Sequence, residues 1–554
     1  MSEPFFITTA IDYTNGAPHI GHAYEKVLAD VLARYHRQIG DEVFFLTGVD
    51  QHGQKVQQSA EKAVISPQEY VDQVTAKFRA LWEKLGVRYD GWAATTEALH
   101  KECVRANLQI LWDDKVAGTD RSRWIYKKTQ RGFYSVRQEQ FLTDKERGAD
   151  GEFGPEWQPV EEREEENFYF RLTGHPDLGF DPKQWLLDFI DRRSQEGRPF
   201  VVPEFRVAEL RNAVEKLEGD LCISRPAARL QWGIPFPESF GEGFVTYVWF
   251  DALVNYITFA PGHDPHYSER TAKEKGAALG FADYWPPLQV IGKDIMIPAH
   301  GVYWAVMLKA LGFTDEEMPT LLVHGWWNIR SKGGESEKMS KSLGNVVDPD
   351  LLADKYGTAA LRYYLMSDIA TGRDADFSEE RLIQRYNVDL ANGLGNLVNR
   401  SLSMTRKYRE GRPRPVDPSY IDLSNHLLEN SNDLGIYRAL FGQFQVQAAL
   451  EALGSVVNRA NALVDSSAPW KLAKEPEQAD RLDAVLATLI LSAQTAATML
   501  FPIIPESAGE ILRQLNLPSV DLNAKISPSL PNGYCCGEPK PVFPRLELPT
   551  PDAV

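Results

Sequence analysis

Apolar positions at the start of the chain change from strand-like to helical spacing within a short stretch. Residues 5–10 form a β-rich run, Phe-Phe-Ile-Thr-Thr-Ala, and Asn15-Gly16 is a turn signal. From Pro18 onward the apolar side chains recur with the period of an α-helix, at Ala23, Val27, Leu28, Val31, Leu32 and Tyr35. The pattern therefore predicts a strand, a turn and a helix, in that order.

Residues 1–117 repeat this alternation, which is typical of a parallel α/β sheet. A second strand is predicted over 42–49, directly before Asp50-Gln51-His52-Gly53, and further buried strands are predicted over 245–250 and 288–291. Residues 118–225 break the alternation and indicate an inserted subdomain. The acidic run over 161–166 is expected to be a solvated face.

From residue 386 onward the pattern is wholly helical. Two apolar stripes of helical period, over 449–464 and 482–500, predict a bundle of helices. The last residues are rich in Pro and Gly, and we expect them to form an irregular tail that packs back on the body.

Composition limits the possible classes of protein. A chain of 554 residues is too long for one hydrophobic core, so roughly two to four domains are expected. Its 43% hydrophobic and 25% charged residues are ordinary for a soluble protein, and no run of eighteen apolar residues offers a membrane span. Because the N-terminus shows no leader pattern, we expect a cytoplasmic location and no membrane partner.

Cysteine content and charge narrow the picture further. None of the four cysteines is spaced as Cys-x-x-Cys, so neither a disulfide framework nor a cysteine zinc knuckle is expected. The net charge of −17 opposes unspecific binding of nucleic acid, which would need a local basic patch. One basic cluster is present, at Arg400, Arg406, Lys407, Arg409, Arg412 and Arg414.

Two segments carry candidate phosphate-binding residues. His19 and His22 lie on the first turn of the predicted helix, where a phosphate is favoured; the alternative is a pair of surface histidines beside a capping turn. Lys338 and Lys341, three residues apart after a glycine-containing stretch, could contact a polyphosphate; the alternative is a surface loop with incidental lysines. Neither a P-loop nor a G-x-G-x-x-G turn is present.

The end of the second predicted strand offers a site for a cation. Ligands of parallel sheets bind at the carboxyl ends of the strands, so Asp50 and His52 should face the same crevice as the two histidines of the turn. The Asp50 carboxylate could hold an ammonium group. The alternative is that Asp50 caps the helix that begins near Gly53.

The motifs form a combination that resembles a known family. Pro18-His19-Ile20-Gly21-His22 and Lys338-Met339-Ser340-Lys341-Ser342, in that order on the two halves of a split sheet, resemble the paired signature of class I aminoacyl-tRNA synthetases. Six further segments resemble methionyl-tRNA synthetases in particular: Ile11-Asp12-Tyr13-Thr14-Asn15-Gly16, Thr47-Gly48-Val49-Asp50-Gln51-His52-Gly53, Ile223-Ser224-Arg225-Pro226, Tyr247-Val248-Trp249-Phe250-Asp251-Ala252, Ile291-Gly292-Lys293-Asp294-Ile295 and Ser466-Ser467-Ala468-Pro469-Trp470. The similarity extends through nearly the whole chain.

The resemblance implies a fold and a domain order. The fold class is α/β, a Rossmann-like parallel sheet split by an inserted connective subdomain and followed by an all-α anticodon-binding bundle. The expected domains are the first half of the catalytic sheet (1–117), the insertion (118–225), the second half (226–325), a linking region with Lys338 and Lys341 (326–385), the bundle (386–520) and the tail (521–554).

The resemblance also implies a reaction. The carboxylate of methionine attacks the α-phosphate of ATP, Mg2+ assists the leaving pyrophosphate, and the methionyl-adenylate then reacts with a hydroxyl of the terminal adenosine of tRNA. In this comparison the phosphates are bound by His19 and His22, Gly21 lets adenine lie against the backbone, and Asp294 holds the ribose. Lys338 and Lys341 close over the pyrophosphate, with Lys341 favoured as the ATP contact.

Positions that match the family's methionine pocket are rich in aromatic residues, which suit a polarizable thioether. They are Ile11, Tyr13, Asp50, Trp249, Ala252, Leu253, Tyr256, His300 and Trp304, with Asp50 on the substrate ammonium. Core packing is the alternative for Trp249, Tyr256 and Trp304.

For the RNA partner, the resemblance implies recognition of the methionine tRNAs, initiator and elongator. Asn396, Arg400 and Trp470 match positions that read the anticodon, one by stacking and two by hydrogen bonding.

Four features depart from the family pattern. The run over 132–141 lacks the cysteine pairs of a zinc knuckle, so no zinc is expected. The chain has one residue more than usual between Lys293-Asp294-Ile295 and His300, and Leu253 stands where many relatives have proline. It stops after the bundle, without the extra tRNA-binding domain that dimerises some relatives, so a monomer is expected.

Three alternatives remain. Synthetases for leucine, isoleucine or valine share the motifs but carry a larger insertion than residues 118–225 can hold. Small-molecule nucleotidyltransferases share the histidine motif but lack the helical bundle. A catalytically silent tRNA-binding or regulatory paralogue would not require both the histidine and the lysine motifs.

Overall fold

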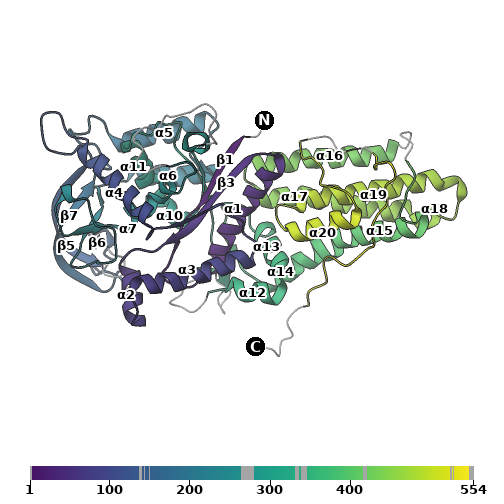
Figure 1. Cartoon of the computed structure of the whole chain (residues 1–554), viewed down its shortest axis with the longest axis horizontal. Helices are drawn as coiled ribbons and strands as arrows, with labels where there is room; N and C mark the ends of the chain where they lie inside the picture. Colours follow the sequence, from purple (N-terminus) through teal and green to yellow (C-terminus); the bar gives the residue numbers. More distant parts are fainter. Residues whose placement is uncertain are drawn as a thin grey trace.

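The chain folds into an elongated molecule with a sheet-containing part at one end and a helical part at the other (Figure 1). This computed structural model describes residues 3–135, 140–142, 144–148, 150–263, 280–330, 336–338, 346–415, 421–523, 527 and 529–547. Helix α1 (Ile20–Ile39) lies between the two parts.

A parallel sheet forms the centre of the first part, with strand order β2-β3-β1-β12-β13-β8 and β4 paired with β3. The strands are β1 (Pro4–Thr9), β2 (Asp12–Tyr13), β3 (Glu42–Asp50), β4 (Gly91–Ala94), β8 (Val201–Val202), β12 (Leu288–Gly292) and β13 (Thr320–His324). Strands β1 and β12 pair in parallel, Thr8 opposite Gln289, although a long insertion separates them in sequence. The sheet is therefore built from two distant stretches of chain, which confirms the predicted fold class.

Three predicted strands are confirmed, with small shifts at their ends, as β1, β3 and β12. The strand predicted over 245–250 is wrong in its second half: β11 (Phe244–Thr246) ends there and α7 (Val248–Leu253) begins. The error has a physical cause. A short apolar run is buried equally well as a strand or as one turn of helix, so hydrophobicity alone does not distinguish them.

Helices cover the sheet and connect its strands. They are α2 (Gln54–Ala63), α3 (Pro67–Lys84), α4 (Ala98–Asp113), α5 (Pro182–Gln195), α6 (Val207–Glu215), α8 (Asn255–Thr258), α9 (Phe281–Tyr284), α10 (Lys293–Ile295), the π-helical η4 (Met296–Trp304) and α11 (Ala305–Ala310). Short 3₁₀ turns occur at η1 (Asp144–Glu146), η2 (Glu204–Arg206), η3 (Glu238–Phe240) and η7 (Pro476–Gln478).

The insertion contains an antiparallel sheet at the far end from the helical part (Figure 1). Its strands are β5 (Ile125–Ser135), β6 (Gln140–Leu142), β7 (Val160–Phe170) and β9 (Leu221–Cys222), beside a hairpin of β10 (Ser224–Pro226) and β11. The acidic run lies on β7 and is partly ion-paired, because Glu166 contacts Lys127 at 2.6 Å and Glu165 contacts Arg229 at 2.8 Å. Strand β8, which the sequence pattern did not reveal, lies between β7 and β9 in sequence but joins the edge of the parallel sheet.

A small sheet and a group of helices link the parallel sheet to the bundle. They comprise β14 (Trp327–Arg330), β15 (Ser336–Lys338), β16 (Ala375–Asp376), α12 (Pro349–Tyr356), α13 (Thr358–Ser367), α14 (Glu379–Arg385) and the π-helical η6 (Tyr386–Gly395). The backbone of Lys338 pairs with Asn328 in this sheet. Its side chain, and the whole of Lys341, lie outside the described residues.

The predicted helical bundle is present. Its helices are α15 (Asn396–Arg409), α16 (Ile421–Gly442), α17 (Val446–Ser467), α18 (Pro469–Leu472), α19 (Ala479–Leu500) and α20 (Pro505–Leu515). Described residues of the tail contact it, since the Cys536 amide donates to the Gly411 carbonyl at 2.9 Å and the Gly537 amide to the Gln514 carbonyl at 2.8 Å. One segment, Pro476–Leu500, is long and apolar enough to cross a membrane, but its apolar window is entirely buried, as in a core helix.

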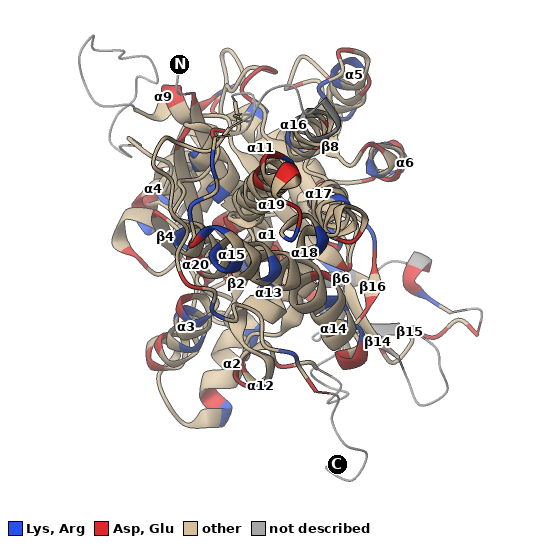
Figure 2. Cartoon of the chain, turned by 90° about the vertical axis from the view of Figure 1, so that its right-hand side faces the viewer, with Lys and Arg blue, Asp and Glu red and all other residues tan. Residues whose placement is uncertain are grey.

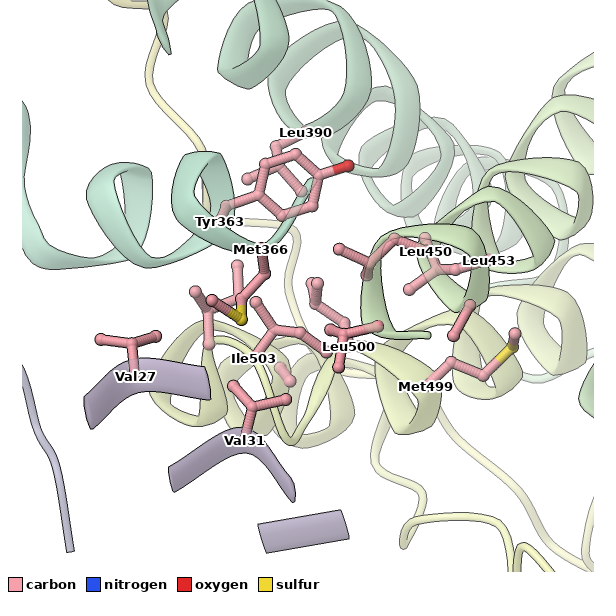
Figure 3. Close-up of a cluster of buried hydrophobic side chains, with 14 of the residues drawn as sticks. Val27, Val31, Tyr363, Met366, Leu390, Leu450, Leu453, Met499, Leu500 and Ile503 are labelled. Atoms are coloured by element: carbon pink, nitrogen blue, oxygen red, sulfur yellow. The ribbon is translucent and has the colours of Figure 1, made fainter. Parts of the chain in front are cut away.

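One hydrophobic cluster joins the bundle to the parallel sheet (Figure 3). Val27 and Val31 of α1 lie in the same cluster as Tyr363 and Met366 of α13. Leu390 of η6 and five bundle residues complete it: Leu450, Leu453, Met499, Leu500 and Ile503. The helix that begins at the two-histidine turn thus packs against α13, and its C-terminal half contacts the bundle, where the rings of Tyr35 and Phe441 stack.

A buried ion pair lies at the same junction. The Asp30 carboxylate accepts hydrogen bonds from Arg362 Nη2 at 2.6 Å and from Arg34 Nε at 2.7 Å, and Asp30 is fully buried. Arg362 also donates to the carbonyls of Leu85 and Ile503, at 3.0 and 2.7 Å. Arg362 therefore connects α1, the end of α3 and the turn between α19 and α20.

Replacing Asp30 should destabilise the protein strongly. The Asp30→Ala variant leaves two arginines buried beside an empty position, which we expect to lower the free energy of unfolding by about 3–5 kcal/mol. Thermal and urea unfolding would measure the loss. Lys84→Met, which breaks the more exposed ion pairs of Lys84 with Asp350 and Asp354, is the control and should change stability far less. Equal effects of the two variants would contradict the prediction.

Candidate active site

A cavity of about 770 Å³ opens at the carboxyl ends of the parallel strands, beside the seam between β1 and β12. This is where ligands of open α/β sheets bind. Its lining includes these predicted site residues: Ile11, Tyr13, His19, Gly21, His22, Asp50, Trp249, Ala252, Leu253, Tyr256, Asp294 and His300. The structure thus brings together the predicted phosphate, ribose and methionine positions around one space.

The two histidines of the turn cap helix α1 reciprocally. The Gly21 amide donates to His19 Nδ1, and the His19 amide donates to His22 Nδ1, each at 3.1 Å. Because Nδ1 accepts in both rings, a neutral imidazole carries its proton on Nε2. The rings lie 3.7 Å apart between centroids. The cap therefore orients two ring N–H donors at a helix N-terminus, which is a favourable site for phosphate.

Glycine is required between these histidines. A Cβ atom at Gly21 would lie 2.9 Å from Cε1 and 3.0 Å from Nδ1 of the His19 ring. Any larger residue would displace the His19 imidazole, which accepts a hydrogen bond from the Gly21 amide. The space beside the Gly21 backbone is part of the cavity.

Tyr256 and His300 form a hydrogen-bonded pair in the cavity wall. His300 Nδ1 lies 3.0 Å from the Ile295 carbonyl, which can only accept, so Nδ1 carries the proton. Burial lowers the pKa of His300 to about 4, so the ring is neutral and its Nε2 accepts from the Tyr256 hydroxyl at 2.8 Å. The hydroxyl hydrogen of Tyr256 is therefore already used.

The additional residue noted before His300 falls in the π-helical segment η4. The segment is not one continuous helix, because Ile297 has an extended backbone with φ −117° and ψ 125°. His300 faces the cavity, whereas Trp304 is fully buried behind Tyr256, with 5.7 Å between their ring centroids. Trp304 shapes the cavity through Tyr256, without lining it in the described structure.

Asp50 lies at the carboxyl end of β3 and lines the cavity. It accepts two long hydrogen bonds, from the His52 amide and from Thr95 Oγ1, each at 3.4 Å. Helix α2 begins at Gly53 without a side-chain cap, so the alternative capping role of Asp50 is wrong.

The prediction for His52 is also wrong. His52 is 3% exposed, and the described residues that line the cavity do not include it. Its Nδ1 atom instead contacts the buried carboxylate of Asp251 at 2.7 Å. The strand ends at Asp50, so the two-residue alternation that would return His52 to the crevice no longer applies.

Sequence analysis missed a buried ionic group in the cavity wall. Lys26 contacts Asp12 at 2.7 Å and Glu25 at 2.8 Å, and Glu25 contacts His324 at 2.9 Å. Burial by itself raises the pKa of Glu25, but Lys26 and His324 outweigh this effect and hold its pKa below the ordinary value. Burial lowers the pKa of Lys26, and Asp12 and Glu25 raise it beyond the ordinary value. The sequence signal for this group was the presence of two charged residues, Glu25 and Lys26, among the apolar positions of α1.

The cavity is also lined by residues that sequence analysis did not assign to the site, including members of this group. They are Ala10, Asp12, Glu25, Lys55, Tyr247, Val248, Asn255, Gly292, Ile295, His324, Gly325, Trp326 and Trp327. Among the described residues there is no group of three or more His, Cys, Asp or Glu side chains placed to hold a metal ion.

The predicted anticodon residues lie on the bundle, away from the cavity. Asn396 begins α15 and contacts Asn461 at 3.4 Å, and Arg400 pairs with Asp465 at 2.9 Å. Trp470, on α18 at the far end of the bundle in Figure 1, is 43% exposed.

The basic cluster over 400–414, on α15 and the residues that follow it (Figure 2), is largely ion-paired. Besides Arg400, Arg406 contacts Glu538 at 3.3 Å, Arg409 contacts Asp483 at 2.6 Å and Arg414 contacts Asp483 at 3.9 Å. The cluster is therefore less positive than its sequence suggests.

A split parallel sheet, a two-histidine turn at its carboxyl edge and a helical bundle define a class I aminoacyl-tRNA synthetase. The family model described as tRNA synthetases class I (M) matches residues 5–151 and 156–402. With this match and the relatives below, the chain belongs to the methionyl-tRNA synthetases, enzymes that attach methionine to tRNA.

Individual relatives cover most of the chain. A methionine–tRNA ligase of Deinococcus radiodurans is 39% identical over 93% of this chain and 70% of its own length. One of Lactococcus lactis is 36% identical over 99% of this chain and 78% of its own. A Mycobacterium tuberculosis methionyl-tRNA synthetase bound by methionyl-adenylate is 33% identical with a TM-score of 0.83, covering 98% of this chain and all (100%) of that chain.

The buried His300 should make stability depend on pH. Its pKa is about 4 in the folded protein against 6.5 ordinarily, so between these values the unfolded chain binds more protons. Stability from this group is complete above pH 6.5 and falls by about 3 kcal/mol as the pH drops to 4.

Unfolding measured across that pH range, in wild type and His300→Gln, checks this expectation. The variant should lose the His300 part of the slope. His175→Gln removes a partly exposed imidazole and should keep the wild-type slope. An unchanged slope in His300→Gln would show that His300 does not titrate as described.

Proposed function

We propose that the cavity is where this enzyme forms methionyl-adenylate from methionine and ATP, the ATP entering as its Mg2+ complex. The observation that carries the proposal is the shared cavity: the capped histidines, Asp50 and the Tyr256–His300 pair all line it. A carboxylate oxygen of methionine attacks the α-phosphorus, the bond to the β-phosphate breaks, and pyrophosphate leaves.

The N-terminus of helix α1 stabilises the negative charge on the phosphates. The Nε2–H groups of His19 and His22, whose rings are oriented by the cap, bind the phosphate oxygens. Adenine lies against the Gly21 backbone, and Asp294 at the end of β12 holds the ribose. Lys338 and Lys341 bind the leaving pyrophosphate, with Lys341 as the ATP contact.

The other end of the cavity holds the amino acid. Asp50 binds the ammonium group, and Ile11, Tyr13, Trp249, Ala252 and Leu253 surround the side chain, with Trp304 behind Tyr256. Because the Tyr256 hydroxyl already donates to His300, the wall offers no unused donor at that position. A thioether, which needs no strong hydrogen bond, suits such a wall.

The second step joins the adenylate to tRNA. A ribose hydroxyl of the terminal adenosine attacks the carbonyl carbon, and AMP leaves. Trp470 stacks on an anticodon base, and Asn396 and Arg400 hydrogen-bond to others. We further propose that the enzyme acts as a monomer in the cytoplasm, without zinc, on both initiator and elongator methionine tRNAs.

Methionine-dependent exchange of pyrophosphate into ATP tests the first step. Two substitutions at one position separate the donor from the cap: His22→Asn keeps an acceptor near the Nδ1 position, and His22→Gln places an amide near Nε2. Since a phosphate donor is worth about 10²- to 10³-fold in rate, His22→Asn should lose that much exchange with little loss of stability. His22→Gln should retain more activity.

Lys341→Ala in the same assay should also lose exchange. Wild-type exchange with methionine and not with other amino acids would support the assignment. Exchange driven by another amino acid would contradict the pocket assignment, and none with any amino acid would favour the silent tRNA-binding paralogue.

Trp470→Ala should impair charging without affecting adenylate formation. Base stacking on an aromatic ring is worth about 1–3 kcal/mol, so kcat/KM for tRNA should fall roughly 10- to 100-fold. Aminoacylation with methionine tRNA measures the loss, and pyrophosphate exchange should stay at the wild-type rate. Ile436→Ala, at another exposed apolar residue of the bundle, is the control. Equal losses in the two variants would contradict a role of Trp470 in tRNA binding.

A further inference from the structure

A fully buried aspartate lies behind the proposed methionine site. Asp251 is 0% exposed, and its two carboxylate oxygens contact different imidazoles: Oδ2 contacts His52 Nδ1 at 2.7 Å, and Oδ1 contacts His100 Nε2 at 2.8 Å. Burial by itself raises the pKa of Asp251, but His52 and His100 outweigh it and hold the pKa at about 2. The carboxylate is therefore ionised throughout the working range of pH.

The three residues come from different elements of the fold. Asp251 lies on α7, between the cavity residues Trp249 and Ala252. His52 follows Asp50 by two residues, 199 positions away from Asp251 in sequence. His100 lies on α4, and its Nδ1 contacts Thr258 Oγ1 of α8 at 3.1 Å. One carboxylate thus connects the end of β3 to the helix that forms the aromatic wall.

The segment around Asp50 is attached to several elements, since Thr14 Oγ1 donates to the Asp50 carbonyl at 2.9 Å and Trp232 Nε1 donates to the Gln51 carbonyl at 2.6 Å. The Gln51 amide donates to Thr95 Oγ1 at 2.9 Å, and the Gly53 amide donates to the Trp232 carbonyl at 3.1 Å. These contacts connect this segment to elements other than α7. The His52–Asp251 hydrogen bond joins this segment to α7 directly.

Stability alone is a poor explanation for this group. Placing a carboxylate in a dry interior costs several kcal/mol, and well-packed apolar residues of similar volume often stabilise a fold as well or better. A buried ionic contact does, however, fix geometry, because its hydrogen bonds are short and directional. Fixed geometry matters at this position, because a substrate bound at both of its ends requires a fixed distance between the two binding groups.

We propose that Asp251, through His52 and His100, is a positioning residue that sets the distance between Asp50 and the aromatic wall, and thereby the affinity for methionine. It acts through His52 and does not touch the substrate. The inference rests on the methionine site proposed above. It goes beyond that site by assigning a role to three buried residues that do not bind a substrate atom.

The Asp251→Asn variant tests the proposal. An amide can accept from one histidine but donates to the other, so one of the two hydrogen bonds is lost unless an imidazole changes its tautomer. In pyrophosphate exchange at saturating ATP, the KM for methionine should rise about tenfold or more, with the KM for ATP within about twofold of wild type. Asp483→Asn is the matched control, since Asp483 is also buried (1% exposed) but pairs with Arg409 in the bundle.

The control separates positioning from stability. Asp483→Asn should lower the unfolding temperature and leave the KM for methionine unchanged. If Asp251→Asn lowers only the unfolding temperature, or raises both KM values equally, the positioning role is wrong.

A second pair of variants applies if Asp251→Asn does not fold. His52→Asn keeps a donor near the Nδ1 position and should keep the KM for methionine near the wild-type value, whereas His52→Ala should raise it about tenfold. Equal KM values in these two variants would overturn the proposal. Failure of the proposed function is distinguishable, because wild type itself would then show no methionine-dependent exchange.

Discussion

The buried pair of Asp30 and Arg362 is the constraint on which the arrangement of the two parts of the molecule depends. Asp30 lies midway along α1, whose N-terminus carries the two histidines, and Arg362 connects it to α3 and to the bundle. Neither charge is stable in the interior without an oppositely charged partner. The apolar cluster around them fills the same junction (Figure 3). The position of the bundle relative to the cavity is thus set by packing and by a specific ion pair, and tRNA bound at Trp470 would meet a rigid frame.

Ion pairing also limits how strongly the basic cluster of the bundle can attract nucleic acid. Arg400, Arg406 and Arg409 each contact a carboxylate, so a polyanion has to replace an existing partner to gain an arginine. A phosphate backbone alone gains little from such an exchange. In the proposed role of Trp470, a base that offers hydrogen-bonding groups in the right geometry would gain stacking as well, which would favour specific RNA over unspecific RNA.

Sequence periodicity predicted the strands β1, β3 and β12 and the helix α1, because long amphipathic or buried runs leave a clear pattern. The motifs predicted residues that line the cavity, since His19 and Asp50 belong to short segments of recognisable spacing, and the family resemblance supplied Tyr256 as a matching position. The partners of these residues were not predictable. His324 meets Glu25 from 299 positions away, and Asp251 meets His52 from 199, and no local pattern encodes such distances. The two-residue strand β8 is likewise too short to leave a period.

Two buried ionic groups, one around Lys26 and one around Asp251, both fix the geometry of the cavity wall. The proposed reaction requires a nucleotide and an amino acid in one relative orientation, and apolar walls alone would allow side chains several rotamers of similar energy. Hydrogen bonds from Lys26 to Asp12, Glu25 and the Ala10 carbonyl restrict the wall near the histidine turn. Those of Asp251 restrict the wall near Asp50. Both groups are paired before any substrate arrives, so binding energy is not needed to order them. Burial of the large apolar interior offsets the desolvation cost of these charges, and their hydrogen bonds fix the geometry of the site.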